Sequence, residues 1–383
     1  MEYRLDLPAS QERVAERLKA SLEADALPQA ILITGSVGVG KRALAMRLAR
    51  ILSCTGEKVR PCGECPYCRA VRPEKGESPW LWVVPLEGSS DRLAKEEDRT
   101  EQTKKVLAPV MSDPWDVSAF PEAGTIRVES IREVLRELGR KDPRPRVVLI
   151  PEADRMAAAP ANALLKTLEE VPENCHFILT TAHRADMLPT ILSRCAKIHL
   201  PEATVGEVGA FLETRGIPAD DLDQLWALAG GSPGKAAFMA GETVSEARAL
   251  AMDLLEWSAK ETSLELLSWW AESAGRKKGA GGSVLKESAR HVAAALSSLI
   301  DDMMRANAGL PARNAAFESR LRALPFAGEG DDVLVWMHRE LLKTARHAEN
   351  SVDPEKVFLA LALKWRNERP RLDLSLASEE GRG

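Results

Sequence analysis

The strongest constraint on this chain is a glycine-rich stretch, 35–42, which reads GSVGVGKR. It follows an apolar run at 30–33 and precedes a helical pattern in which Leu44, Leu48 and Leu52 recur on one face. A strand, a glycine-rich turn and a helix in this order are typical of a phosphate-binding loop, in which backbone N–H groups and the helix N-terminus surround an anion. The residues predicted to contact phosphate are Gly35, Gly38, Gly40 and Lys41.

The position after Lys41 departs from the pattern of an active P-loop. A serine or threonine there supplies a hydroxyl ligand to Mg²⁺, and this chain has Arg42 instead. Arginine cannot ligate a metal, but its guanidinium carries the charge that the metal would supply. Two outcomes stay open: Arg42 replaces that charge beside a bound nucleotide, or it folds back and fills the pocket.

A second magnesium ligand is also replaced. The apolar segment 146–150 predicts a buried strand, and in P-loop ATPases such a strand ends in an Asp that holds Mg²⁺, often followed by a Glu that orients water. Here Pro151 stands at the Asp position and Glu152 at the Glu position. Two replacements that affect the same ion argue against hydrolysis of Mg–ATP, although nucleotide binding without hydrolysis stays open.

Four cysteines lie within fifteen positions just after the P-loop helix. Their spacing, C-x7-C-x2-C-x2-C, suits a tetrahedral structural Zn²⁺ site, which would stabilise the fold and leave no open position for catalysis. Disulfides conflict with a reducing compartment, and a redox dithiol needs only two of the thiols. The predicted ligands are Cys54, Cys62, Cys65 and Cys68.

Composition limits the possible functions of the chain. Over 383 residues, 45% are hydrophobic and 28% charged, and the net charge of −5 does not favour broad capture of nucleic acid. We find no apolar run long enough to span a membrane and no signal-peptide core, so we expect a cytoplasmic protein. A zinc-ribbon DNA-binding protein is a weak alternative, because few basic residues flank the cysteines.

The order of the predicted elements indicates an α/β fold. Strands near 30–33, 80–84, 146–150, 176–181 and 197–200 alternate with helices, which predicts a parallel sheet covered on both faces. The charged stretch 87–124 is read as a surface insertion, partly helical at most. We expect the P-loop domain to cover 1–201, a small helical lid domain 202–243, an all-α domain 244–370, and a disordered tail 371–383.

Together these motifs resemble the bacterial DNA polymerase III clamp-loader subunits of the AAA+ class. The resemblance is carried by the P-loop, the four-cysteine module, the strand at 146–150, the helix 162–170 and the triplet Ser193-Arg194-Cys195. It implies an AAA+ P-loop domain, a lid and an oligomerising collar domain. It also implies partners: gamma/tau and delta subunits in a hetero-oligomeric ring that loads the sliding clamp onto primed DNA.

Within this family, gamma/tau subunits hydrolyse ATP, whereas delta-prime typically does not. Arg42, Pro151 and the segment 231–235, where an ATPase subunit would carry a sensor arginine, all depart toward delta-prime. A gamma/tau-type ATPase is the alternative. The resemblance implies that Arg194 acts in trans as an arginine finger, stabilising charge on the γ-phosphate bound by a neighbouring subunit. The residue-based alternative is that Arg194 forms a local ion pair.

Overall fold

The computed structural model describes residues 5–56, 60–88, 95–120, 124–140, 145–219, 222–240, 242–259, 284–312, 317–325, 330–350 and 354–368. The chain forms two compact units. The first comprises Met1–Ile217 and Ala229–Phe238, and the second comprises Pro218–Leu228 and Met239–Gly383. Among the described residues no helix is both long and apolar enough to cross a membrane.

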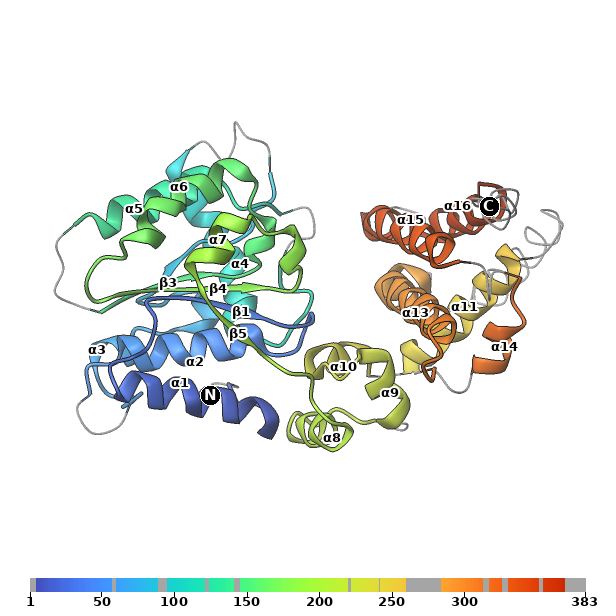
Figure 1. The fold of residues 1–383 in the computed structure, drawn as a ribbon, viewed down its shortest axis with the longest axis horizontal. Helices are drawn as coiled ribbons and strands as arrows, with labels where there is room; N and C mark the ends of the chain where they lie inside the picture. The colour runs from blue at the N-terminus through green and yellow to red at the C-terminus, as the bar shows by residue number, and fades with distance from the viewer. Residues whose placement is uncertain are drawn as a thin grey trace, which may run out of the picture. The chain divides into compact units, whose positions relative to one another are not determined.

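A five-stranded parallel sheet lies at the centre of the first unit (Figure 1). The strand order is β2-β3-β4-β1-β5, so the P-loop strand lies beside the last strand in sequence. This arrangement confirms the predicted α/β fold of the AAA+ class. The bounds are β1 Ala30–Thr34, β2 Leu81–Trp82, β3 Arg146–Ile150, β4 Cys175–Thr181 and β5 Ala196–His199.

Helices cover both faces of the sheet, because side chains alternate along each strand and both sets are apolar. Leu32 and Phe177 face a layer made by helices α5, α6 and α7, whereas Ile31 belongs to the other face of the sheet, where α1 and α2 lie (Figure 1). Ile31, Leu32 and Phe177 are all fully buried. The helix bounds are α1 Ala9–Glu23, α2 Lys41–Ser53, α3 Pro66–Arg69, α5 Val128–Leu138, α6 Ala158–Glu169 and α7 Pro189–Arg194.

The described part of the predicted charged insertion, 87–124, is partly helical as expected, but it is not confined to the surface, because one side of its helix is buried. Residues Glu96–Ser112 form a helix of 17 residues, α4, whose apolar side is buried at Leu107, Val110 and Met111. The buried Arg99 anchors this helix by pairing with Glu133 of α5. The charges at its N-terminal end obscured an apolar face that begins two turns later.

The remaining helices of the first unit are α8 Val205–Thr214 and α10 Pro233–Met239. Helix α8 begins with a capping box, in which the Thr204 hydroxyl accepts from the Glu207 amide and the Glu207 carboxylate accepts from the Thr204 amide.

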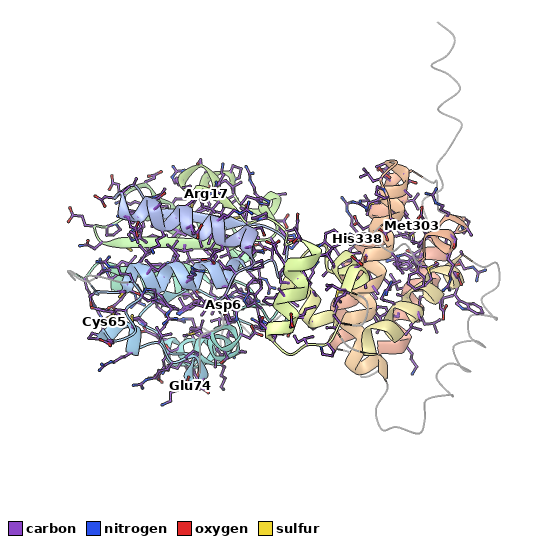
Figure 2. All side chains as sticks on the ribbon, turned by 90° about the horizontal axis from the view of Figure 1, so that it is seen from below. Asp6, Arg17, Cys65, Glu74, Met303 and His338 are labelled. Carbon is purple, nitrogen blue, oxygen red and sulfur yellow. The ribbon has the colours of Figure 1, made fainter. Side chains whose placement is uncertain are left out.

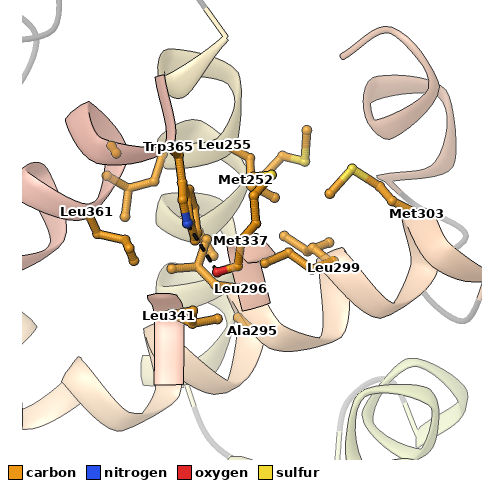
Figure 3. Packing of buried hydrophobic residues seen from close by; sticks show 14 of the residues in the cluster. Met252, Leu255, Ala295, Leu296, Leu299, Met303, Met337, Leu341, Leu361 and Trp365 are labelled. Atoms are coloured by element: carbon orange, nitrogen blue, oxygen red, sulfur yellow. Dashed lines mark hydrogen bonds between the residues drawn. The ribbon is translucent and has the colours of Figure 1, made fainter. Parts of the chain in front are cut away.

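The second unit is helical, as predicted. Its core is built from α11, α13, α15 and α16, and the indole of the buried Trp365 donates a 3.1 Å hydrogen bond to the Met337 carbonyl (Figure 3). Residues 260–283, which belong to the predicted all-α domain, and the predicted tail at 371–383 lie outside the described residues. The bounds are α9 Leu222–Ala229, α11 Glu242–Ser258, α13 Val284–Asn307, α14 Glu318–Arg322, α15 Asp331–Asn350 and α16 Pro354–Asn367.

Candidate functional site

The predicted P-loop connects β1 to α2, with Gly40 as the N-cap of the helix. The Lys41 ammonium group lies inside the loop and donates to two of its carbonyls, Gly35 O at 2.8 Å and Ser36 O at 2.6 Å. Burial lowers the pKa of Lys41 to about 8, and the adjacent Arg42 charge acts in the same direction. The lysine is thus held by the loop itself.

Two other segments of the same unit pack directly against the loop. A Cβ placed on Gly38 would lie 2.7 Å from both the Ser232 hydroxyl and a Val117 methyl, and one placed on Gly40 would lie 2.5 Å from the Trp115 ring. Ser232 donates to the Val37 carbonyl at 2.7 Å. We call residues 113–120 and 232–235 the plug, because Trp115, Val117 and Ser232 pack directly on the glycines of the loop.

Arg42 is held by the plug. Its Nη2 donates to the Asp116 carbonyl, and its guanidinium lies 5.1 Å from the centre of the Phe120 ring. Burial lowers the pKa of Arg42, and the nearby carboxylate of Glu152 partly offsets that effect. Of the two outcomes left open by the sequence, this geometry corresponds to the side chain folded onto protein groups.

Arg42 and Pro151, which stand at the two positions of the magnesium ligands, are neighbours in space. Arg42, Pro151 and Thr180 line one small cavity of about 10 Å³, which is room for about one water molecule. The acidic groups beyond Pro151 already have partners: Glu152 pairs with Arg155 at 2.5 Å, and Asp154 accepts from the Thr181 hydroxyl at 2.6 Å. Since Arg42 and Pro151 offer no oxygen side chain, neither can supply the metal ligand that its position provides in an ATPase.

A buried ion pair joins the plug to the end of helix α8. The Arg215 guanidinium is almost fully buried and pairs with Asp113 at 3.0 Å. It lies 4.4 Å from the Phe211 ring centre, and that ring packs on Trp115 at 4.6 Å between centroids. Helix α8 and the segment after α4 are therefore joined by charge and by aromatic packing.

Arg194 is the last residue of α7, and its side chain is partly exposed. Its Nε donates to the Glu169 carboxylate of α6 at 2.8 Å, and its Nη2 donates to the same oxygen. The local ion pair considered from the sequence is thus present in this single chain.

The four predicted cysteine ligands come together. Their sulfur atoms all lie within 4.8 Å of one another, and none of the four cysteines forms a disulfide. Tetrahedral Zn²⁺ with bonds of about 2.3 Å separates its sulfurs by distances of this order. Cys54 directly follows α2 and Cys65 caps α3, so the cluster joins these two helices (Figure 2 labels Cys65).

Backbone amides surround the cluster, as in a site that favours thiolates. Burial by itself raises the pKa of Cys65. Hydrogen bonds from backbone amides, first that of Cys68, outweigh this effect and lower the pKa to about 5. The Cys62 amide donates to the Cys54 sulfur at 3.2 Å. The donor set therefore fits zinc. Outside the cluster, burial raises the pKa of Cys175 and Cys195 to about 11.

Sequence reasoning singled out the segment 231–235 only for its missing arginine, and it did not place that segment or 113–120 against the P-loop. Trp115 and Ser232 are almost completely buried, yet they lie more than a hundred positions apart and in segments without regular periodicity. One observation could have found the first segment: a tryptophan and a phenylalanine, Trp115 and Phe120, follow a charged stretch, and large aromatic residues are usually buried at least in part.

Comparison with known proteins identifies the family. Residues 10–204, about half of the chain, match the family model described as "DNA polymerase III, delta subunit". The chain belongs to the DNA polymerase III clamp-loader family. The matched region contains the sheet, the P-loop, the cysteine cluster and Arg194, so the resemblance carried by these motifs is confirmed.

The relatives of this chain include both tau or gamma subunits and delta' subunits of DNA polymerase III. The chain is 32% identical over 204 residues to DNA polymerase III subunit tau of Escherichia coli, and these cover 53% of this chain and 26% of that protein. It is 31% identical over 223 residues to subunit delta' of Pseudomonas aeruginosa, covering 57% and 58% respectively. For delta' of Bacillus subtilis the identity is 29%, covering 48% and 46%. The chain thus spans less than two thirds of each, and its identity to both kinds is similar.

A solved structure of a DNA polymerase III, gamma subunit-related protein from Thermotoga maritima aligns with 76% of this chain and 96% of its own. The sequence identity is 17% and the TM-score is 0.35.

Proposed function

We propose that this chain is the delta-prime subunit of a bacterial clamp loader, an AAA+ subunit that does not hydrolyse ATP. The observation that carries the proposal is the contact of the plug with the P-loop, in which Trp115 and Ser232 pack against the loop and Asp116 holds Arg42. A nucleotide that entered with Mg²⁺ would find neither metal ligand and would have to displace the plug. ATP binding without hydrolysis is compatible with the proposal only if the plug moves.

We further propose that Arg194 completes the ATP site of a neighbouring gamma/tau subunit. Its partly exposed position at the end of α7 supports this role, since a short rotation away from Glu169 would present the guanidinium to solvent. An arginine finger contributes by stabilising charge on the γ-phosphate in the transition state. In the isolated chain, the pair with Glu169 keeps that charge compensated.

The other parts of the chain are assigned on the same basis. We propose a zinc ion at Cys54, Cys62, Cys65 and Cys68, a lid domain at 202–243, and a collar domain at 244–370 that associates with gamma/tau and delta in a hetero-oligomeric ring. The helical core of the second unit supports an assembly role, because it holds its own buried apolar cluster. Contact with the sliding clamp and primed DNA would come through the complex, in the cytoplasm.

ATPase assays test the proposal. The purified chain with Mg–ATP should show no turnover above background, whereas a gamma/tau-type subunit would hydrolyse ATP, and robust turnover would reject the delta-prime assignment. In a complex reconstituted with gamma/tau and delta, Arg194→Ala should lower the rate of ATP turnover at the one adjoining site by roughly 10³-fold. Arg184→Ala is the control, because it removes another exposed arginine, just before α7 in the sequence.

A second variant separates the finger from the local ion pair. Glu169→Gln removes the partner of Arg194 but leaves the arginine in place, so turnover of the complex should be retained. If Glu169→Gln and Arg194→Ala lowered turnover equally, the ion pair rather than the finger would be the feature that matters.

A further inference from the structure

An open groove of about 770 Å³ lies between α1 and the end of β5. Its apolar part is formed by Val14 and Ala20 of the helix and by Pro201 after the strand. The volume is in the range of sites that accept a drug-sized ligand or a short peptide. None of the motifs that place this chain in its family lies in the groove.

One border of the groove is a free strand edge. In the sheet order, β5 is the last strand and pairs only with β1 among the described strands. The Leu200 amide donates to the Thr34 carbonyl of β1. Successive amides of a strand point to opposite sides, so those of Lys197 and His199 point away from β1. A row of outward N–H and C=O groups is a template for one more strand.

The other border carries positive charge. Arg13 and Arg17 lie one helical turn apart on the exposed side of α1, and both line the groove together with His199 (Figure 2 labels Arg17). Neither arginine forms an ion pair with a described residue. By contrast, Lys19 on the same helix pairs with Glu23.

Helix α1 is fixed in position beside the strand. The fully buried Gln11 donates to Val39 O at 2.7 Å and to Pro201 O at 3.1 Å, which joins the helix to the P-loop and to the end of β5. The Ser10 amide donates to Glu207 at 2.6 Å, which joins it to the lid helix. The groove is therefore preformed, and a ligand would not have to order its walls.

We propose that this groove binds an extended acidic segment of a partner protein. The segment adds as a sixth strand along β5, its apolar side chains contact Val14 and Pro201, and its carboxylates pair with Arg13 and Arg17. Main-chain hydrogen bonds supply affinity in this mode of recognition, and side-chain contacts supply specificity. The inference does not depend on whether the chain is delta-prime or gamma/tau.

Nucleic acid fits the same groove less well. A duplex needs a continuous basic surface that neutralises many phosphates, whereas this groove offers two arginines, one histidine and an acidic residue, Glu16. The apolar part of its lining, Val14, Ala20 and Pro201, offers nothing to a phosphate backbone. A peptide that alternates apolar and acidic residues matches both parts.

A peptide array tests the proposal with the full chain. Eight-residue peptides in which valine or isoleucine alternates with aspartate or glutamate are compared with peptides in which the same residues alternate with lysine. The labelled protein should bind acidic members only, and the strongest member should bind saturably in fluorescence anisotropy. No binding to acidic peptides, or equal binding to basic ones, would overturn the proposal.

Variants then locate the site. Arg13→Glu and Arg17→Glu should each weaken the peptide about fivefold or more, whereas Lys19→Glu, the same charge change outside the groove, should change it less than about twofold. All three residues are exposed, so each variant should stay folded, which thermal unfolding checks; Lys19→Glu should show only the small loss expected from removing the exposed pair with Glu23. A peptide N-methylated at alternate residues should bind at least about tenfold more weakly, since it cannot pair with β5. Equal affinity for the methylated peptide, or tighter binding of a 12-bp DNA duplex than of the peptide, would contradict strand addition.

Discussion

The ring of Trp115 lies against the Cα of Gly40, so close that a Cβ on this glycine would meet the ring at 2.5 Å. Gly40 has φ +113°, a conformation that other residues rarely adopt, and it is the N-cap of α2. Gly40 thus both forms the turn of the phosphate-binding loop and contacts the buried indole of Trp115. The loop and the plug form one packed structure.

Gly40→Ala should therefore lower the free energy of unfolding through two effects. The strained backbone costs about 1–3 kcal/mol, and the clash with Trp115 adds a similar amount. Gly216→Ala is the matched control, because Gly216 also has positive φ (+65°) but a Cβ there meets nothing within 4 Å. Chemical denaturation of both variants measures the difference, and equal losses would show that Trp115 is not a constraint.

Restoring the missing magnesium ligands should not restore hydrolysis. In the double variant with Arg42→Ser and Pro151→Asp, the plug residues Trp115 and Ser232 still fill the surroundings of the loop. We expect no phosphate release above the level of the parent chain. Arg42→Ser alone should also lose about 1–2 kcal/mol of stability, since the hydrogen bond to Asp116 is removed. Turnover by the double variant would mean that the plug is no barrier.

The buried Lys41 should make stability depend on pH in alkaline solution. Its pKa is lowered to about 8 in the folded chain from an ordinary value of 10.5, so the unfolded chain binds more protons between these values. Stability from this group therefore rises as the pH increases through that window. Between about pH 7.5 and about pH 10, the parent should gain about 2 kcal/mol relative to Lys41→Met.

Urea unfolding at the two pH values measures this gain. Lys19→Met, at an exposed lysine, should follow the parent at both. Parallel behaviour of the parent and Lys41→Met would show that Lys41 titrates normally in the folded chain.

The cysteine cluster should hold about one zinc per chain. Cys62→Ser should release it and lower the unfolding temperature, because the four sulfurs join the end of α2 to α3. Cys195→Ala, which changes a buried thiol outside the cluster, should retain the metal. Metal analysis of the purified variants decides the point, and a parent protein without zinc would refute the assignment.

The sheet, the P-loop and the cysteine cluster were predictable because each is encoded locally. Apolar runs bounded by turns mark the strands, and the identities of Arg42 and Pro151 can be read directly from the sequence. Helix α4 was also within reach: Leu107, Val110 and Met111 follow helical spacing, but the preceding charges, Glu96 to Glu101, were taken as typical of the whole stretch.

The plug was out of reach for a different reason. Its contacts join Trp115 and Val117 to Ser232 and to the loop glycines, across long separations in sequence, and no periodicity marks either segment. Such contacts depend on how helices and loops pack in three dimensions. The pair of Arg194 with Glu169 likewise required the structure, because it joins the ends of two different helices.

The packing around the P-loop also bears on how its sequence signature should be interpreted. A side chain on Gly38 would collide with Ser232 and Val117, and one on Gly40 would collide with Trp115. Selection for a stable interior is therefore enough to preserve both glycines over evolutionary time, with or without a bound nucleotide. In a loop packed this way, an intact glycine pattern reports the packing of the interior as well as the capacity to bind phosphate, so the pattern by itself does not identify an active ATPase.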